Sequence, residues 1–281
     1  MYYCRDCDEQ FQGEKRIRDI TLWNEYLTDR RTVSEPAVIH KCSERTIRRH
    51  LALAADNFNS VCPESAVIIT DTTYFSRSFG VMLFMDAESG KILHRKYVRN
   101  ETNRDYLDGL NHIEEFGTEI KSVVCDGHTG LLQAINSCPA QMCQFHQLQI
   151  IRRLLTKDPH LSAGIELLKL VQSMFPMKKN EFISLFNKWC EDWEDFLNER
   201  TVLLSGKATY IHRRLRTARR SIRTHLKWLF TYEEHPELNI PNTTNRLEGF
   251  NTHIKKALLN HNGLNDINKK KFIDGLLNTK K

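Results

Sequence analysis

Residues 66–126 restrict the fold more than any other part of the chain, because their pattern changes from strand to helix and back. Three runs rich in aliphatic and β-branched residues follow one another: AVIITD (66–71), SFGVMLFMD (78–86) and KILHRKYV (91–98). Short polar segments separate them, which predicts an antiparallel meander of three strands. A helical pattern over 103–117, with Asn103 as its N-cap, then leads to IKSVVCDG (120–127), which predicts a buried strand.

Two aspartates end apolar strands of this pattern. Asp71 ends the first run and Asp126 ends the last. A strand reached through a helical crossover normally lies parallel in the same sheet, so we expect the two acids to be neighbours at its carboxyl edge. A single aspartate there usually opens a turn. Two adjacent carboxylates repel each other, and a divalent cation relieves this repulsion by using both as ligands. The pattern therefore predicts an α/β fold with a cation site.

Composition sets wide limits. The 281 residues allow one large domain and a small one, and 40% hydrophobic content supports an ordinary core. The formal net charge of +6 is compatible with nucleic acid, although many unrelated proteins share it. The sequence has no signal-peptide pattern and no apolar run of membrane-spanning length, so we expect a cytoplasmic protein without a membrane partner. Eight cysteines then indicate reduced thiols or metal ligands.

The first 13 residues contain a Cys-x-x-Cys pair, Cys4 and Cys7, beside aromatic residues. This spacing is typical of one knuckle of a zinc ribbon. Tetrahedral zinc needs four ligands, and Cys42 and Cys62 are not arranged as a second knuckle. Two alternatives remain open: a partial zinc site whose other pair lies outside this chain, or two free cysteines.

Residues 14–57 have a helical pattern that predicts a DNA-binding helix-turn-helix. Ser34 is placed to cap a short helix, and Ser43 to cap a second helix after a tight connection. The second helix repeats apolar residues at helical spacing: Ile47, Leu51 and Ala54. Its other faces carry the arginines expected to contact DNA: Arg45, Arg48 and Arg49. The alternative is a plain helical hairpin with a solvated basic face.

A second basic stretch spans residues 205–227 and contains no acidic residue. Apolar residues interleave with the charges at helical spacing, which predicts a helix with guanidinium groups on its remaining faces. Such a surface suits phosphate contact, whereas a solvated charged helix normally carries compensating acids. The arginines expected to bind DNA are Arg213, Arg214, Arg216, Arg219, Arg220 and Arg223.

Several motifs together resemble the DDE transposases of bacterial insertion sequences related to the Mutator superfamily. They are TDTTYF, CDGHTGLLQAI, QMCQFHQLQIIRRLL and NTTNRLEGFNTHIKK, and the resemblance covers nearly the whole chain. It implies a catalytic domain with a ribonuclease H-like fold over 66–281, with a helical insertion at about 156–240. Between the two longest helical patterns of this insertion, nothing resembles a strand.

The resemblance also assigns residues, partners and an activity. Asp71, Asp126 and Glu248 match the three catalytic acids of the family, which bind two divalent cations, Mg or Mn, about 3.5–4 Å apart. The implied reaction is metal-dependent cleavage at the ends of an insertion sequence, followed by strand transfer. The implied partners are double-stranded DNA, as transposon ends and target, and further copies of the chain on that DNA. A bacterial, nucleoid-associated protein is expected.

The segment around Glu248 fits this role physically. Leu247 begins an apolar helical stripe, and Glu248 lies on the border of that stripe, beside the core. Thr243 or Thr244 is placed to cap the helix, and Asn245 to orient the carboxylate or contact a phosphate.

The pair Cys143 and His146 matches the Cys/His signature of the family. Two ligands make no structural zinc site, so we expect packing or a DNA-backbone contact, with a core pair as the alternative. Two other functions remain for the whole chain: a helix-turn-helix regulator without enzymatic activity, or an inactive transposase remnant.

Overall fold

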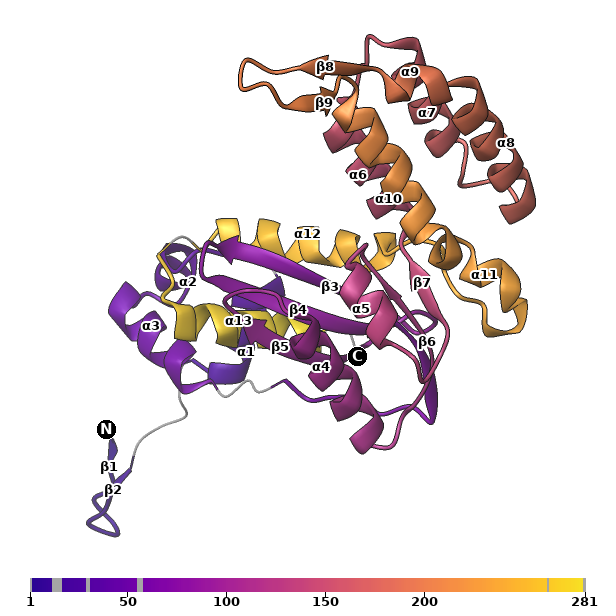
Figure 1. Cartoon of the computed structure of the whole chain (residues 1–281). Coiled ribbons are helices and arrows are strands. Elements are labelled where there is room, and N and C mark those ends of the chain that lie inside the picture. Colours follow the sequence, from indigo (N-terminus) through magenta and orange to yellow (C-terminus); the bar gives the residue numbers. More distant parts are fainter. Residues whose placement is uncertain (1, 12–16, 29–30, 55–57, 262, 280–281) are drawn as a thin grey trace. The chain divides into compact units, whose positions relative to one another are not determined.

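The structure is a computed structural model whose elements are labelled in Figure 1. The described residues are 2–11, 17–28, 31–54, 58–261 and 263–279. The chain divides into two compact units, of which the larger comprises residues 60–249. The smaller unit combines the N-terminal region with residues from 250 onward. We expected a catalytic domain over 66–281, and its C-terminal part is instead grouped with the N-terminal helices.

The larger unit is built on a five-stranded mixed sheet, in the order β5-β4-β3-β6-β7. Its strands are β3 (Ser65–Ser76), β4 (Phe79–Asp86), β5 (Ile92–Val98), β6 (Glu119–Cys125) and β7 (Ala140–Met142). The first three form an antiparallel meander, whereas β6 and β7 run parallel to β3. The predicted meander and the predicted parallel strand after a helical crossover are therefore confirmed. However, β3 continues five residues beyond Asp71, so this acid lies inside a strand rather than at its end.

Helix α4 (Asn103–Glu115) is the predicted crossover helix, and it packs on the sheet through Tyr106 and Leu110. Its N-cap is Thr102 rather than Asn103, because the Thr102 hydroxyl accepts a hydrogen bond from the Asp105 N–H (3.2 Å). A threonine hydroxyl serves this purpose as well as an asparagine amide does, so the sequence pattern fits either register.

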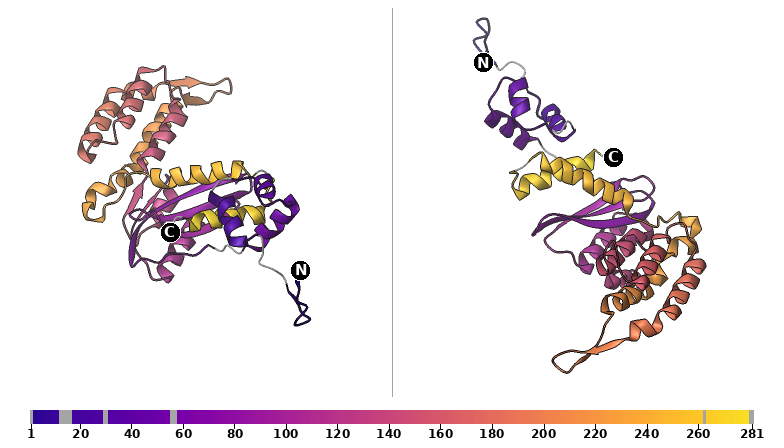
Figure 2. Two further views of the ribbon diagram at one scale, coloured as in Figure 1. Left: turned by 180° about the vertical axis from the view of Figure 1, so that it is seen from behind. Right: turned by 90° about the horizontal axis from the view of Figure 1, so that it is seen from above.

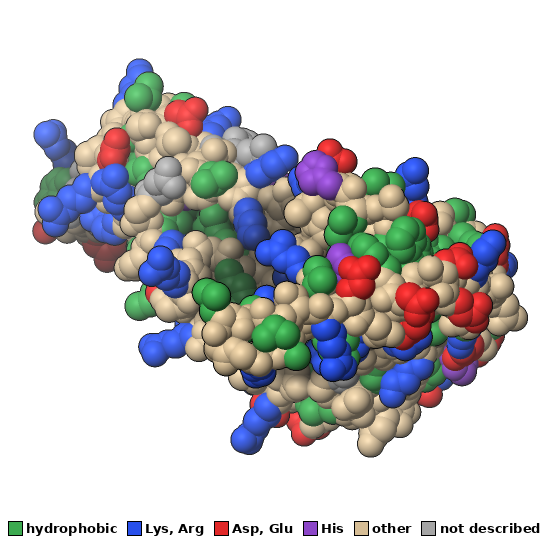
Figure 3. All heavy atoms as spheres, turned by 45° about the horizontal axis from the view of Figure 1, so that its top comes forward, with side chains coloured by type: hydrophobic (Ala, Val, Ile, Leu, Met, Phe, Trp, Pro, Cys, Tyr) green, Lys and Arg blue, Asp and Glu red, His purple; other side chains and the backbone are tan. Residues whose placement is uncertain are grey.

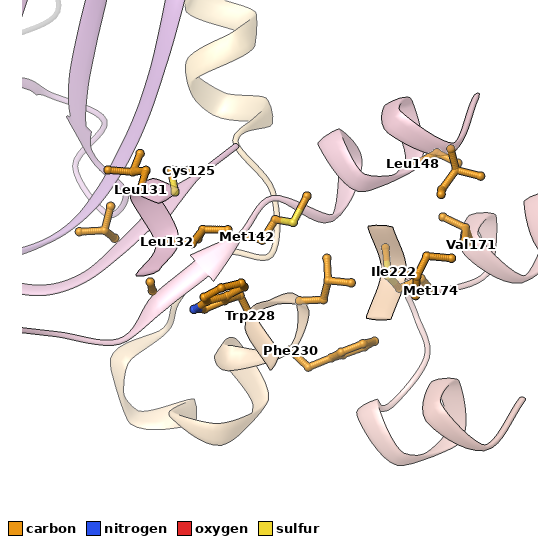
Figure 4. Close-up of a cluster of buried hydrophobic side chains, with 14 of the residues drawn as sticks. Cys125, Leu131, Leu132, Met142, Leu148, Val171, Met174, Ile222, Trp228 and Phe230 are labelled. Carbon is orange, nitrogen blue, oxygen red and sulfur yellow. The ribbon is translucent and has the colours of Figure 1, made fainter. Parts of the chain in front are cut away.

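Helices beyond β7 form a group at one end of the sheet, which Figure 2 shows from two further directions. They are α6 (Gln144–Leu155), α7 (Ser162–Gln172), α8 (Lys179–Asp192), α9 (Glu194–Asn198) and α10 (Arg213–Leu229). Shorter elements complete the unit: α5 (Thr129–Ala134), α11 (Thr231–Glu234) and the 3₁₀ helix η1 (Pro236–Leu238). One buried cluster runs from the sheet into this group, and Figure 4 shows Cys125, Met142, Ile222 and Phe230 within it.

A β-hairpin interrupts the predicted helical insertion. Strands β8 (Arg200–Val202) and β9 (Ala208–Tyr210) pair with each other in an antiparallel manner between α9 and α10. The basic helix consequently begins at Arg213 rather than near residue 205.

The smaller unit contains residues 14–57, where we predicted a helix-turn-helix, and residues 14–16, 29–30 and 55–57 of that region lie outside the described residues. Its N-terminal elements are β1 (Tyr2–Tyr3), β2 (Gln10–Phe11), α1 (Asp19–Thr28), α2 (Ser34–Ile39) and α3 (Glu44–Leu53). Ser43 caps α3 by accepting from the Thr46 N–H (3.2 Å), and Ile47 and Leu51 are buried as expected. Ser34 is no cap, because Val33 occupies that position and no side-chain cap bond forms.

The C-terminal helix α13 (Asp266–Asn278) completes this unit. The sequence pattern did not predict this helix. The Phe272 ring lies 5.6 Å from the Tyr26 ring of α1. The Lys271 ammonium donates to the carbonyl of Leu51 (2.8 Å) at the end of α3. Helix α12 (Asn245–Leu259) crosses the boundary between the two units. None of the described helices is long and apolar enough to cross a membrane.

A half-buried histidine on β5, His94, predicts a pH dependence of stability. Burial and the positive charge of His112, whose ring lies 4.2 Å away, lower the pKa of His94 to about 4. In the unfolded chain the pKa returns to about 6.5. The stability contributed by neutral His94 is therefore complete above about pH 6.5 and is lost as the pH falls towards 4. We expect His94→Gln to unfold with a smaller loss of Tm over this range than the wild type, and parallel curves would contradict this.

Candidate functional site

Asp71 and Asp126 are brought together by strand register. In the parallel pair β3 and β6, Ile68 faces Val123 and Ile69 faces Val124. Continuing this register by two residues places Asp71 opposite Asp126. Asp71 and Asp126 are therefore the same number of residues apart in the sequence as the paired residues of β3 and β6 are.

Strand alternation gives the direction of the Asp71 side chain. Thr72 contacts the hydroxyl of Tyr106 on α4 (3.0 Å), so it faces that helix. Because side chains alternate along a strand, Asp71 faces away from α4. Asp126 directly follows Cys125, the last residue of β6, so it lies at the end of the neighbouring strand.

The third acid, Glu248, is brought to this site by contacts at the start of α12. The backbone carbonyl of Asn242 accepts from the Gln144 N–H (2.9 Å), and the Thr244 N–H donates to the Cys143 sulfur (3.3 Å). The Thr244 hydroxyl in turn donates to Glu248 Oε1 (2.8 Å). Cys143 is fully buried at the N-cap of α6. Cys143 thus contacts the segment that carries Glu248.

Arg246 fixes the first turn of α12 from another direction. Its guanidinium donates to three carbonyls of the β4–β5 turn: Ala87 (2.5 Å), Glu88 (2.8 Å) and Ser89 (3.0 Å). Gly90 completes this turn with a φ of +74°, and a Cβ there would lie only 2.3 Å from the guanidinium. Glu248 is therefore held between the start of α6 and this turn.

His146 lies among the acids. Its Nδ1 is 3.7 Å from Glu248 Oε1. Although burial opposes its charge, contact with Cys143 and the negative charges of Asp71 and Glu248 raise the pKa of His146 to about 9. The positive charge of His146 also acts on Asp126, where it tends to lower the pKa. All three acids are therefore within electrostatic range of one imidazole.

A second cluster adjoins Asp126. His128 Nε2 lies 3.0 Å from Glu101 Oε1 and 3.5 Å from Asp126 Oδ2. Burial and the neighbouring Glu101 charge raise the pKa of Asp126, despite the opposing effect of His128. Burial alone would raise the pKa of Glu101, but hydrogen bonds from His128 and Tyr106 hold it below its ordinary value. The site thus contains more negative charge than the three predicted acids supply.

Two sets of side chains have the geometry of metal ligands. The ligand atoms of Glu101, Asp126 and His128 lie within 4.8 Å of one another, as do those of Cys143, His146 and Glu248. Carboxylate oxygens suit Mg or Mn, whereas a sulfur, a nitrogen and an oxygen together are closer to a zinc set.

Sequence reasoning missed Glu101, His128 and Arg246 as parts of this site. Glu101 lies in the loop between β5 and α4, and nothing in the surrounding sequence distinguishes it from an ordinary loop glutamate. His128 stands two residues after Asp126, which is the one local signal that could have identified it. Asn245, which we expected to assist Glu248, is exposed.

The basic helix α10 carries most of its arginines on the surface. Arg213, Arg214, Arg220 and Arg223 are exposed. Three of them, Arg213, Arg220 and Arg223, line a pocket of about 490 Å³ together with Tyr210, Arg216 and Arg219. Figure 3 shows that Lys and Arg side chains are spread widely over one face of the molecule, while acidic side chains gather mainly at the right of the view.

Arg219 differs from its expected role. It is buried and pairs with Glu194 of α9, so a compensating acid comes from outside the basic stretch. Arg216 is half-buried and donates to the Leu197 carbonyl (3.0 Å). On α3 of the smaller unit, the predicted arginines are exposed: Arg45, Arg48 and Arg49.

The exposed arginines of α10 give a prediction for DNA affinity. We expect Arg214→Ala with Arg220→Ala to weaken binding to all duplexes alike and to reduce the salt slope by about two, because each arginine releases about one counterion from the phosphates. Arg152→Ala, which removes a positive charge from α6, is the matched control. Fluorescence anisotropy across a salt series measures this. A loss confined to one DNA sequence would contradict phosphate contact.

The N-terminal cysteines lie in the turn of a small hairpin. Strands β1 and β2 pair, and the Cys4 N–H donates to the Glu9 carbonyl (2.9 Å). Hydrogen bonds from Cys7 and from the backbone of Asp6 lower the pKa of the Cys4 thiol. This arrangement favours a thiolate, the form that binds zinc, and both cysteines are free. Residues 1, 12 and 13 of the predicted knuckle lie outside the described residues.

Comparison with known proteins assigns no family. No family model matches the chain, and no curated protein matches it. Among solved structures, it is similar to a chain of the cryoEM structure of the simian T-cell lymphotropic virus intasome in complex with PP2A regulatory subunit B56 gamma, at 13% identity and a TM-score of 0.24. The similarity covers 67% of this chain and 63% of that chain, too weak a likeness to carry an argument.

Proposed function

We propose that this protein is a DNA transposase of the DDE type, which cleaves the ends of an insertion sequence and joins them to target DNA. One observation carries the proposal: Asp71, Asp126 and Glu248, from three distant segments, lie within electrostatic range of the same imidazole, His146. These are the acids that the resemblance to Mutator-related transposases assigns to catalysis. Strand order β5-β4-β3-β6-β7 is compatible with the ribonuclease H-like fold which that resemblance implies.

The donor set of the site fits a divalent cation. Asp71 lies in β3 and Asp126 directly follows β6, the parallel neighbour of β3, and burial together with the charge of Glu101 raises the pKa of Asp126. Burial is the main cause, so the charged carboxylate is poorly solvated, and a cation bound to its oxygens would offset this cost. When bound, two such cations activate an attacking oxygen and stabilise a leaving oxygen in phosphoryl transfer.

The side chains of the chain itself have separable tasks in this proposal. Asp71 and Asp126 provide fixed carboxylate oxygens. Thr244 and Arg246 orient the helix turn that presents Glu248. The exposed arginines of α3 and α10 bind phosphates and position the DNA, because guanidinium groups pair well with phosphate oxygens.

Metal binding and cleavage test the proposal with independent readouts. Mn²⁺ should raise the Tm of the wild type, and Asp71→Asn should abolish most of this rise, because ligand binding stabilises only the folded state. An end-labelled duplex from the DNA flanking the gene should be cut in Mg²⁺ or Mn²⁺ and not in chelator. A wild type that neither gains stability from Mn²⁺ nor cuts DNA would refute the proposal.

A DNA-binding regulator without enzymatic activity is the second candidate. The capped helix α3, with exposed Arg45, Arg48 and Arg49, favours it independently of the acids. A wild-type chain that binds a specific duplex but leaves it intact in Mn²⁺ would select this function, or an inactive remnant, over the transposase.

A further inference from the structure

The tip of the β8–β9 hairpin has an unusual composition. A tight turn runs from Leu203 to Gly206, closed by the Gly206 N–H donating to the Leu203 carbonyl (2.8 Å). Turns normally carry Gly, Pro, Asn, Asp or Ser. Here three consecutive aliphatic side chains stand in solvent: Val202 and Leu203 are 68% and 43% exposed, and Leu204 is fully exposed. Figure 1 shows the hairpin projecting from the helices of its unit.

The base of this hairpin is fastened to the neighbouring helices. The Ile211 N–H donates to the Glu199 carbonyl (3.0 Å), and the His212 ring stacks on Phe196 at 3.7 Å. Arg216 of α10 lies over the Tyr210 ring at 3.6 Å. Contacts at the base therefore fix the direction of the hairpin, while its apolar tip has no such packing.

The charge around the tip identifies the kind of partner. Residues 200–232 contain seven arginines, two lysines and no acidic residue. On the hairpin itself, Arg200 and Lys207 flank the aliphatic tip and are exposed. A duplex offers two rows of phosphates beside a stack of apolar base faces, so one ligand matches both the cations and the tip. The predominance of arginine favours phosphate recognition in fixed geometry.

We propose that the β8–β9 tip inserts into duplex DNA as an apolar wedge. Leu203 and Leu204 enter between base pairs and unstack them, while Arg200, Lys207 and α10 hold the flanking phosphates. Inserted aliphatic side chains of this kind unstack and bend a duplex. The inference rests on the proposed function only in taking DNA as the ligand.

A duplex carrying 2-aminopurine tests the wedge, because this base fluoresces more strongly when it is unstacked. The wild type should raise its fluorescence several-fold on saturation. Leu203→Ser with Leu204→Ser should abolish the rise and weaken binding by about tenfold or less, because the phosphate contacts remain. The Tm should not change, since both side chains are exposed. The matched control, Lys207→Ala, should weaken binding while retaining the rise.

Further outcomes separate this inference from its alternatives. Glu248→Gln should unstack DNA like the wild type, so a failure of the proposed catalysis leaves the wedge result intact. The wedge is refuted if the double serine variant still unstacks DNA, or if the wild type binds DNA without any rise or does not bind it. Binding of anionic phosphatidylglycerol vesicles that is lost in the serine variant, without any effect on DNA, would identify a lipid surface instead.

Discussion

Glu248→Gln is expected to reduce the proposed cleavage and strand transfer by about a thousandfold or more, because it removes a charge that the proposed metal-dependent chemistry requires. Glutamine keeps the size of the side chain and can still accept from the Thr244 hydroxyl, which lies 2.8 Å from the carboxylate. DNA binding should be unchanged, since the arginines of α3 and α10 remain. Gel-based cleavage of a labelled duplex, with anisotropy for binding, measures both effects.

The design of this experiment excludes a structural explanation. Glu237→Gln is the matched control, because Glu237 is an exposed acid of the same unit that belongs to neither set of candidate metal ligands. Asp71→Asn and Asp126→Asn should behave like Glu248→Gln, and any pair should lose little more activity than one alone, because residues that act as a unit are not additive. If Glu248→Gln cuts DNA normally and unfolds at a lower temperature, Glu248 is a structural residue.

Gly109→Ala is expected to destabilise the larger unit by about 3 kcal/mol, the upper end of the range for overpacking a core. Gly109 lies in α4 against the sheet, and a Cβ there would be 2.2 Å from Cζ of Phe84. Phe84 is fully buried in the centre of β4, so it has no free space to move into. Denaturant unfolding followed by circular dichroism measures the loss.

A second substitution tests the cause of this loss. Phe84→Leu should be destabilising alone, because it leaves a cavity. Combined with Gly109→Ala, however, it should be less destabilising than the sum, because the smaller side chain makes room for the added methyl. Gly117→Ala is a poor control owing to its φ of +94°, whereas Gly249→Ala adds a methyl with nothing within 4 Å. Additive effects of the pair would contradict a steric origin.

Local patterns predicted much of the larger unit. Alternating and continuous apolar runs identified the strands around Ile68, Phe84 and Val123, and the amphipathic spacing of Tyr106 and Leu110 identified the crossover helix. These signals are local in the sequence, because side-chain periodicity reports directly on which face of an element is buried. The hairpin after α9 was missed since each strand has only three residues, too few to establish a period.

The candidate site was predictable in part. Asp71 and Asp126 follow from strand order, since a parallel pair reached through a helical crossover places them together. Glu248 depended on a resemblance, because no local pattern links α12 to a sheet more than a hundred residues earlier. Glu101 and His128 appeared only in the folded chain, where hydrogen bonds join them beside Asp126.

The sequence by itself determined the longer elements of the larger unit, the order of its first four strands and the two aspartates associated with them, because these depend on periodicity and on the handedness of short connections. Only the tertiary structure decided which distant groups meet. In the folded chain, Thr244 hydrogen-bonds to Cys143 and Arg246 to the β4–β5 turn, while Glu194 forms an ion pair with Arg219. Such contacts arise from long-range packing and pairing of charges, which have no fixed spacing along the chain. The neighbours of Glu248 could therefore be identified only from the tertiary structure, whereas the proximity of Asp71 and Asp126 follows from the order of the strands in the sequence.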